Sequence, residues 1–369
     1  MTSPRDPVPR PGIAAIRGFT PDHAKDPPPG SIRLWANESS LGPSPHAVAA
    51  YHAAAAHMLR YPDGSAGAIR AALAAEYNLD AARILMGVGS DELLSAAVRA
   101  YAGPGDEVLT PTATFPMYRT YAQSVGAAPV QAPDRDFATD VDALLGNVTA
   151  ATKVVIVANP NNPSGTYARR AEIERLRAGL RDDILLIIDA AYAEYCERDD
   201  YEAGAALADA TRNTAMTRTF SKIHGLAGLR LGWLYAAADI VGVVGRLRSS
   251  FNVPAPAQAA GVAALADRAH RDAVIAHCRR WRAALAQRLG GLGLAVSGSE
   301  GNFVTFGFAG GSAQASAAEA FLRDRGLLLR PMAAFGMPGY LRVTIGRDDE
   351  MAAFLAAMEA MMDSPAFKR

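Results

Sequence analysis

Hydrophobic positions along the chain follow two alternating patterns from about residue 46 onwards. Short apolar runs bounded by Gly, Pro and Asn are typical of strands that are covered on both faces. Segments in which apolar residues recur every three or four positions are typical of helices. Residues 91–101, for example, place Leu93, Leu94, Ala97 and Val98 on one face of a helix.

These patterns predict an alternating succession of strands and helices up to about residue 256. Strands are expected at residues 83–88, 107–110, 153–158, 184–189, 214–220 and 230–235. Helices are expected at residues 46–60, 67–77 and 91–101. Such alternation predicts an α/β fold, with a large domain built on a mostly parallel central sheet between helices.

Beyond residue 256 the pattern changes to longer helices and half-buried strands. Helices are expected at residues 257–266, 271–289, 315–325 and 349–362, and strands at residues 302–308 and 341–345. We therefore predict an N-terminal arm (1–45), a large domain (46–256) and a smaller α+β C-terminal domain (257–369). The arm holds ten of the 23 prolines and is expected to be extended rather than helical.

Composition narrows the class of protein. The chain has 369 residues, of which half are hydrophobic and one fifth are charged, as in ordinary globular proteins of about two domains. Its 37 basic and 37 acidic residues cancel, which argues against a nucleic-acid or polybasic membrane surface. Two cysteines, no secretory signal and no apolar run of about 20 residues predict a cytoplasmic protein.

Lysine is unusually scarce. Only four of the 37 basic residues are lysines, namely Lys25, Lys153, Lys222 and Lys368. Lysine can lose its proton and act as an amine nucleophile, whereas arginine stays charged. Because Lys368 lies next to the C-terminus, the other three are the candidates for such chemistry.

Lys222 has the most suggestive surroundings. It follows the predicted strand at 214–220 directly and precedes Gly225, Gly228 and Arg230. A lysine on a Gly-rich turn at the end of a buried strand can be desolvated, which frees its amine. Ser221 and Arg230 offer a hydroxyl and a guanidinium to a phosphate. The alternative is a solvated loop lysine beside a structural arginine.

Polar residues also follow two other predicted strands. Asn162 lies in the run Asn-Pro-Asn-Asn-Pro-Ser-Gly that begins at residue 159, and Asp189 ends the apolar run at 184–188 with Tyr192 three residues later. Ligands of open α/β sheets bind at the carboxyl ends of strands. A buried carboxylate also needs a cationic or hydrogen-bonding partner, such as a protonated ring nitrogen. The alternatives are a plain Asn-Pro turn and an Asp that caps a turn.

Three further segments carry possible binding groups. In the Gly-Ser-Asp turn, Gly89 permits close approach of the backbone, and Ser90 begins a helix whose N-terminus favours anions, although Ser90 could be only the N-cap. Arg342 lies inside an apolar strand and could bind a carboxylate, or it could face solvent. Arg330 ends another apolar run and could equally be solvated.

Together these segments resemble a known family. The glycine-serine-aspartate turn, the Asn-Pro-Asn-Asn-Pro run, the strand-end Asp with its Tyr, Ser-Lys with an Arg eight residues later and the late Leu-Arg strand occur in a characteristic order. Over nearly the whole chain, this order resembles the fold-type I, pyridoxal-phosphate-dependent aminotransferases of class I/II. The resemblance implies an enzyme that moves an amino group between an amino donor and a 2-oxo acid.

The resemblance also implies a role for each residue. Lys222 would hold pyridoxal phosphate covalently and then carry the proton, while Asp189 would keep the ring nitrogen protonated. Asn162 and Tyr192 would bind the phenolic oxygen. Cofactor contacts would further come from Phe115 stacked on the ring (unless it is an ordinary core aromatic), from Ser90, Ser221 and Arg230 at the phosphate, and from Gly89 and Asp91 in the same turn as Ser90. Tyr61 would reach the partner subunit's phosphate, which implies a homodimer.

Within the family, the chain most resembles the histidinol-phosphate aminotransferase branch. The similarity lies in Arg-Tyr-Pro-Asp-Gly from residue 60, Gly-Ser-Asp-Glu-Leu from residue 89, Asn-Phe-Val from residue 302 and Leu-Arg-Pro-Met from residue 329. Asn37, in Ala-Asn-Glu, fits as well. Asn37, Arg330 and Arg342 would bind substrate, with Arg342 on its α-carboxylate, or on the equivalent end of a substrate lacking one, and Arg330 on its distal phosphate or carboxylate.

The chain departs from this branch at residues 39–41. Ser-Ser-Leu stands there where members usually carry Asn-Pro-Tyr, whose tyrosine lies near the distal end of the substrate. Aromatic amino acids are therefore an alternative donor. Two further alternatives are a pyridoxal-phosphate-dependent decarboxylase of a phosphorylated amino acid and a non-catalytic sensor. A sensor would usually carry an N-terminal DNA-binding module, for which the Pro-rich arm offers no counterpart.

Overall fold

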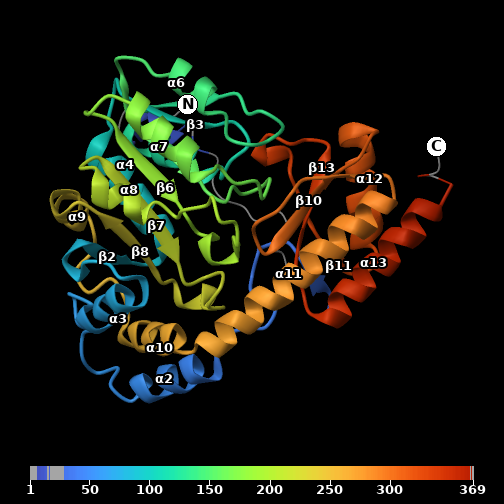
Figure 1. The fold of residues 1–369 in the computed structure, drawn as a ribbon, viewed down its shortest axis with the longest axis horizontal. Helices are drawn as coiled ribbons and strands as arrows, with labels where there is room; N and C mark the ends of the chain where they lie inside the picture. Colours follow the sequence, from blue (N-terminus) through green and yellow to red (C-terminus); the bar gives the residue numbers. More distant parts are fainter. Residues whose placement is uncertain (1–5, 15, 17–28, 366, 368–369) are drawn as a thin grey trace.

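The protein is described by a computed structural model that covers residues 6–14, 16, 29–365 and 367. A large sheet with its helices occupies one side of the molecule (Figure 1). A smaller sheet with α12 (Gly311–Arg323) and α13 (Asp348–Asp363) occupies the other side, and the long helix α11 (Arg268–Gly291) extends from the first part to the second.

The large sheet has seven strands in the spatial order β2-β8-β7-β6-β5-β3-β4. Its strands are β2 (Ile84–Gly87), β3 (Glu107–Pro111), β4 (Ala128–Ala132), β5 (Thr152–Ala158), β6 (Leu185–Asp189), β7 (Thr214–Thr219) and β8 (Gly232–Ala236). Only β8 runs antiparallel to its neighbours, and all other pairs are parallel. The predicted α/β fold with a mostly parallel sheet is therefore confirmed.

Helices cover both faces of this sheet. The helices of this part are α2 (Pro45–Ala55), α3 (Gly67–Tyr77), α4 (Gly89–Tyr101), α5 (Met117–Val125), α6 (Val141–Gly146), α7 (Arg170–Gly179), α8 (Ala205–Ala210), α9 (Ala238–Gly245) and α10 (Ala255–Ala266). Alternate residues of β5 show why both faces are apolar. Val154 and Ile156 pack with α4 and α5, whereas Val155 and Val157 pack with α6 and α7.

The smaller part is built on an antiparallel sheet in the order β12-β13-β10-β9. Its strands are β9 (Ala295–Val296), β10 (Phe303–Gly307), β12 (Arg330–Pro331) and β13 (Tyr340–Thr344). Strand β1 (Ile32–Arg33) pairs in parallel with β11 (Leu327–Leu328), which joins the N-terminal arm to this part. The division of the chain at residues 45 and 256 stays a prediction; the two main sheets use residues 84–236 and 295–344.

Helix α1 (Pro11–Ala14) shows that the prediction of an arm without helix is wrong at this point. Pro11 is its first residue, where the missing N–H would have no helical partner in any case. Arg10 fixes the turn from outside, because its Nη2 donates a hydrogen bond to the carbonyl of Ser124, 2.7 Å away. The prolines thus exclude a long helix but permit a single turn.

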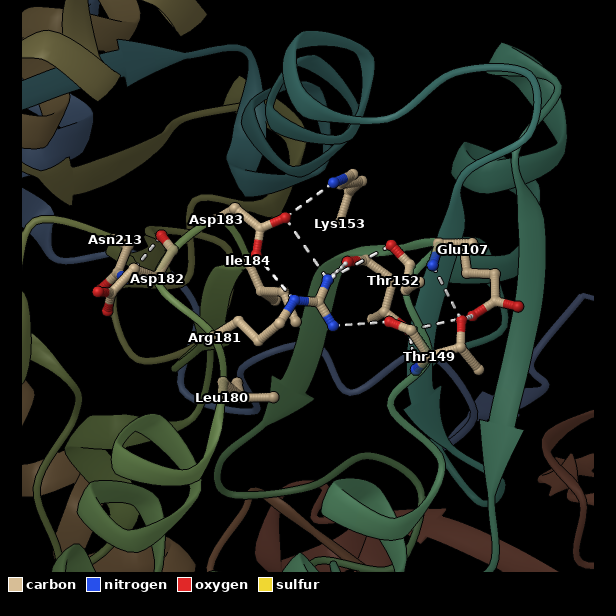
Figure 2. Close-up of polar contacts among 12 residues, drawn as sticks. Glu107, Thr149, Thr152, Lys153, Leu180, Arg181, Asp182, Asp183, Ile184 and Asn213 are labelled. Carbon is tan, nitrogen blue, oxygen red and sulfur yellow. Dashed lines mark hydrogen bonds and ion pairs between the residues drawn. The ribbon is translucent and has the colours of Figure 1, made fainter.

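Arg181 ties together the beginnings of neighbouring strands in the large sheet (Figure 2). Its Nη1 donates to the carbonyl of Thr149 over 2.7 Å, and its Nε donates to Asp183 Oδ1 over 2.9 Å. Asp183 in turn pairs with Lys153, with 2.8 Å between Nζ and Oδ2. Lys153 is therefore engaged at the amino end of β5, opposite to the carboxyl ends at which ligands bind.

Candidate active site

A cavity of about 630 Å³ lies at the carboxyl ends of the central strands, where the two parts of the molecule meet. Asp189 at the end of β6, Lys222 after β7 and Asn162 after β5 line it from the large sheet. Arg330 in β12 and Arg342 in β13 line it from the smaller sheet. The cavity thus brings together residues that are far apart in the sequence.

Lys222 is half-buried in this cavity. Its Nζ donates to the carbonyl oxygens of Ala36 and Asn37, at 3.2 and 3.1 Å. Burial, assisted by the positive charge of Arg342, lowers the pKa of the Lys222 amine from 10.5 to about 8. The sequence predicted a lysine with a freed amine, and the structure provides the desolvation that such an amine requires.

This lowered pKa predicts how the protein without cofactor reacts with an aldehyde at different pH values. Only the neutral amine attacks, and at pH 7 a pKa of about 8 leaves about one amine in ten neutral. The rate of covalent attachment of pyridoxal phosphate should rise about tenfold per pH unit below pH 8 and level off above it. Stopped-flow absorbance measures this rate; a rise that continues unchanged to pH 10 would contradict the lowered pKa.

Asp189 is a buried carboxylate, with 7% of its surface exposed. The hydroxyl of Tyr118 donates to its Oδ2 over 2.7 Å, and that of Thr217 donates to its Oδ1 over 3.2 Å. Burial nevertheless raises the pKa of Asp189, because these neutral donors only partly replace water. A protonated nitrogen in the cavity would be a stronger partner for this carboxylate.

Removing the Tyr118 hydroxyl should lower the rate of amino transfer measurably. Tyr118→Phe removes a hydrogen bond to a buried charged group, and such a bond contributes about 1.5–3 kcal/mol. We expect the kcat of amino transfer to fall about tenfold with little change in KM, because Asp189 would be held less firmly. Tyr121→Phe is the matched control three residues later. Equal losses in both variants would indicate that α5 itself is disturbed.

Hydrogen bonds pair Tyr192 with Asn37, and Asn162 with Arg342. The Tyr192 hydroxyl accepts a bond from Asn37 Nδ2 over 2.9 Å, and its pKa is raised by burial. Asn162 accepts from the guanidinium of Arg342 through its Oδ1. Two of the predicted cofactor contacts are therefore linked to two of the predicted substrate contacts.

Arg342 is buried, so the alternative of a solvent-facing arginine is wrong. Its Nη2 donates to the carbonyl of Trp35 over 3.0 Å, while its Nε has no hydrogen-bond partner among the described residues. Burial lowers the pKa of Arg342 to about 10. An incoming carboxylate would offset this desolvation, which suits a binding role for the guanidinium.

The turn at the start of α4 and the residues after β7 form a possible anion site. Ser90, Ser221 and the exposed Arg230 all line the cavity. Gly89 has a φ of +81°, and a Cβ there would lie 2.7 Å from Arg230 Nη2, so the turn and the guanidinium are in contact. Asp91 lines the same region and accepts a bond from the Tyr121 hydroxyl. Its charge opposes an anion there.

Phe115 also lines the cavity, as predicted for a ring that stacks on a cofactor, and it meets Tyr118 edge to face. Tyr61 does not reach the cavity of its own chain. It is 83% exposed and stacks on Phe251, with ring centres 4.9 Å apart. Its predicted contact with a partner subunit stays a prediction.

Sequence reasoning missed several residues of the cavity. Tyr118 could have been found, because it lies only three residues after Phe115. Trp35 and Phe335 had no such signal, since their place in the cavity depends on how the arm and the loop before β13 fold back. Thr217, which touches Asp189 although it is not among the cavity-lining residues, lies on β7 and reaches Asp189 only because the two strands are neighbours.

The residues fit a pyridoxal phosphate group. The cavity provides an amine of lowered pKa, a buried carboxylate for a protonated ring nitrogen, and a serine- and arginine-lined turn for a phosphate. Together with the fold, these features define a pyridoxal-phosphate-dependent enzyme of fold type I. The family model described as aminotransferase class I and II matches residues 29–358, so the chain belongs to this family of transaminases.

The sequences of several relatives align with nearly the whole length of this chain. A histidinol-phosphate aminotransferase from Rhodospirillum rubrum is 50% identical over 364 residues, which cover 98% of this chain and 99% of that protein. One from Paramagnetospirillum magneticum is 47% identical over 355 residues, covering 96% and 98%. The crystal structure of histidinol-phosphate aminotransferase from Sinorhizobium meliloti with pyridoxal-5'-phosphate superimposes with a TM-score of 0.87 at 26% identity, covering 95% and 97%.

Proposed function

We propose that this protein is a histidinol-phosphate:2-oxoglutarate aminotransferase, an enzyme of histidine biosynthesis. One structural observation carries the proposal: Arg330 and Arg342 are direct neighbours across β12 and β13 and line the same cavity as Lys222. Two guanidinium groups suit doubly charged anions, such as a phosphate ester or a dicarboxylate. The relatives named above support the same substrate.

The roles of the residues follow from their positions. When bound, pyridoxal phosphate supplies an electron sink for the electron pair at the substrate Cα. Lys222 would hold the cofactor and then move the proton at Cα, and Asp189 would hold a positive charge on the ring nitrogen. Arg342 would orient the substrate, with Asn37 and Tyr192 fixing the neighbouring groups.

A screen of amino donors tests the proposal. The holoenzyme is mixed with histidinol phosphate, phenylalanine, tyrosine or aspartate, and the absorbance of the lysine-bound cofactor is followed. Conversion by histidinol phosphate at far lower concentrations than by the others is expected. Preference for phenylalanine or tyrosine would favour an aromatic aminotransferase, and release of carbon dioxide would favour a decarboxylase. Leu41, where the family tyrosine is missing, is 40% exposed and is not among the cavity-lining residues.

We also propose that the enzyme is a cytoplasmic homodimer. Met58, Leu59 and Tyr61 are 77%, 90% and 83% exposed and form an apolar stretch after α2. A second copy would cover it and would bring Tyr61 to the neighbouring cavity. Free Cys196 and Cys278 suit a reducing compartment, and no described helix combines the length and apolarity that a bilayer crossing requires. Sedimentation velocity distinguishes a dimer from a monomer.

A further inference from the structure

Arg330 lies close to two aromatic rings of the cavity. Its guanidinium carbon is 5.8 Å from the centre of the Trp35 ring and 5.7 Å from that of Phe335. A guanidinium within about 6 Å of an aromatic ring is attracted by the electrons of its face. The contact with Trp35 joins the N-terminal arm to β12, so the arm helps to form the cavity wall around this arginine.

The backbone of Trp35 is held independently of its ring. The N–H of Leu34 donates to the carbonyl of Leu328 over 2.9 Å, and the carbonyl of Leu34 accepts from the N–H of Thr344 over 2.8 Å. The carbonyl of Trp35 accepts a bond from Arg342 over 3.0 Å. Trp35 therefore contacts both arginines. Its carbonyl accepts a hydrogen bond from Arg342, and its ring lies against the guanidinium of Arg330.

We propose that the indole ring of Trp35 positions the Arg330 guanidinium, and thereby sets how strongly the enzyme prefers a phosphorylated amino donor over the same donor without phosphate. This inference rests on the proposed function. Arginine binds phosphate through two parallel hydrogen bonds, which require a fixed orientation of the planar group. A flexible arginine side chain loses more rotamer freedom on binding than one already held against aromatic rings.

Trp35 differs in this respect from Phe335, the other ring beside Arg330. The Phe335 ring also lies 5.5 Å from the guanidinium carbon of Arg342. Changes at Phe335 would therefore affect both arginines, whereas changes to the Trp35 side chain leave the carbonyl bond to Arg342 available. This separation makes Trp35 the position at which recognition of the distal group can be altered alone.

The test compares histidinol phosphate with histidinol in Trp35→Ala, Trp35→Phe and unmodified holoenzyme. In Trp35→Ala we expect kcat/KM for histidinol phosphate to fall about tenfold, mainly through KM, with histidinol unchanged. Trp35→Phe should restore most of the preference, because it retains an aromatic face. The inhibition constant of inorganic phosphate should rise with the KM for histidinol phosphate.

The outcomes separate this inference from the proposed function. If unmodified enzyme does not prefer histidinol phosphate over histidinol, the proposed function fails, and the inference fails with it. If unmodified enzyme has this preference and Trp35→Ala keeps it, only the inference is overturned. Equal losses of kcat/KM for both donors would assign Trp35 a structural role and would also overturn the inference. Phe335→Leu, expected to impair both donors, provides the comparison for such a general loss.

Discussion

Replacing Lys222 by alanine should abolish amino transfer, with a loss of ~10⁴-fold or more in kcat. Lys222 is the one described lysine that lines the cavity, and its two hydrogen bonds to the carbonyls of Ala36 and Asn37 aim the amine into it. No neighbouring side chain can take over both covalent attachment and proton transfer. Arg230 and Arg342 also line the cavity, but a guanidinium is not an amine nucleophile.

Lys153→Ala is the matched control for this experiment. Lys153 pairs with Asp183 at the amino end of β5, and both side chains are partly exposed. We expect nearly unchanged kinetics and a small loss of stability, because exposed ion pairs contribute little. Single-turnover absorbance with histidinol phosphate measures the reaction, and the spectrum shows whether cofactor is still bound. Activity of Lys222→Ala within tenfold of the unmodified enzyme would refute the assignment.

The strands and long helices were largely predictable from the sequence. Every predicted strand overlaps an observed one, because the strands of both sheets that were predicted form buried apolar runs or alternate as half-buried strands do. The edge strand β4 was missed, since it is partly exposed and lacks such a run. The predicted helix at 46–60 ends at Ala55, and beyond it Met58 and Leu59 are 77% and 90% exposed, so they add no buried apolar face to continue it.

The candidate site was predictable where its residues follow buried strands. Asp189, Asn162 and Lys222 each lie at or just beyond a strand end, and a parallel sheet gathers these ends at one edge. The contribution of the N-terminal arm could not be predicted in the same way. Asn37 meets Lys222 across 185 residues of sequence, and no local pattern specifies such a contact. The contact between the N-terminal arm and Lys222 depends instead on how β1 and β13 pack in the folded protein.

Asp189→Asn should lower kcat by about a thousandfold while leaving the fold intact. The amide has the shape of the carboxylate; its oxygen can accept from one of the Tyr118 and Thr217 hydroxyls, and its NH2 group can donate to the other. It carries no negative charge, so it cannot stabilise a proton on a ring nitrogen nearby. Removing the charge also removes the desolvation penalty that raises the pKa of Asp189, so thermal stability should be equal or higher.

Three measurements make this prediction specific to charge. Asp189→Glu keeps the charge but moves it by one methylene, and it should retain more activity than Asp189→Asn if electrostatics dominates. Asp183→Asn makes the same chemical change at the opposite edge of the sheet and should leave kcat unchanged. Without the Asp189 charge, a proton on the ring nitrogen would be lost more easily. The pH-dependent change in the spectrum of the bound cofactor should therefore occur at a lower pH in Asp189→Asn than in the unmodified enzyme. A thousandfold loss without this spectral shift would mean that Asp189 acts on some other group.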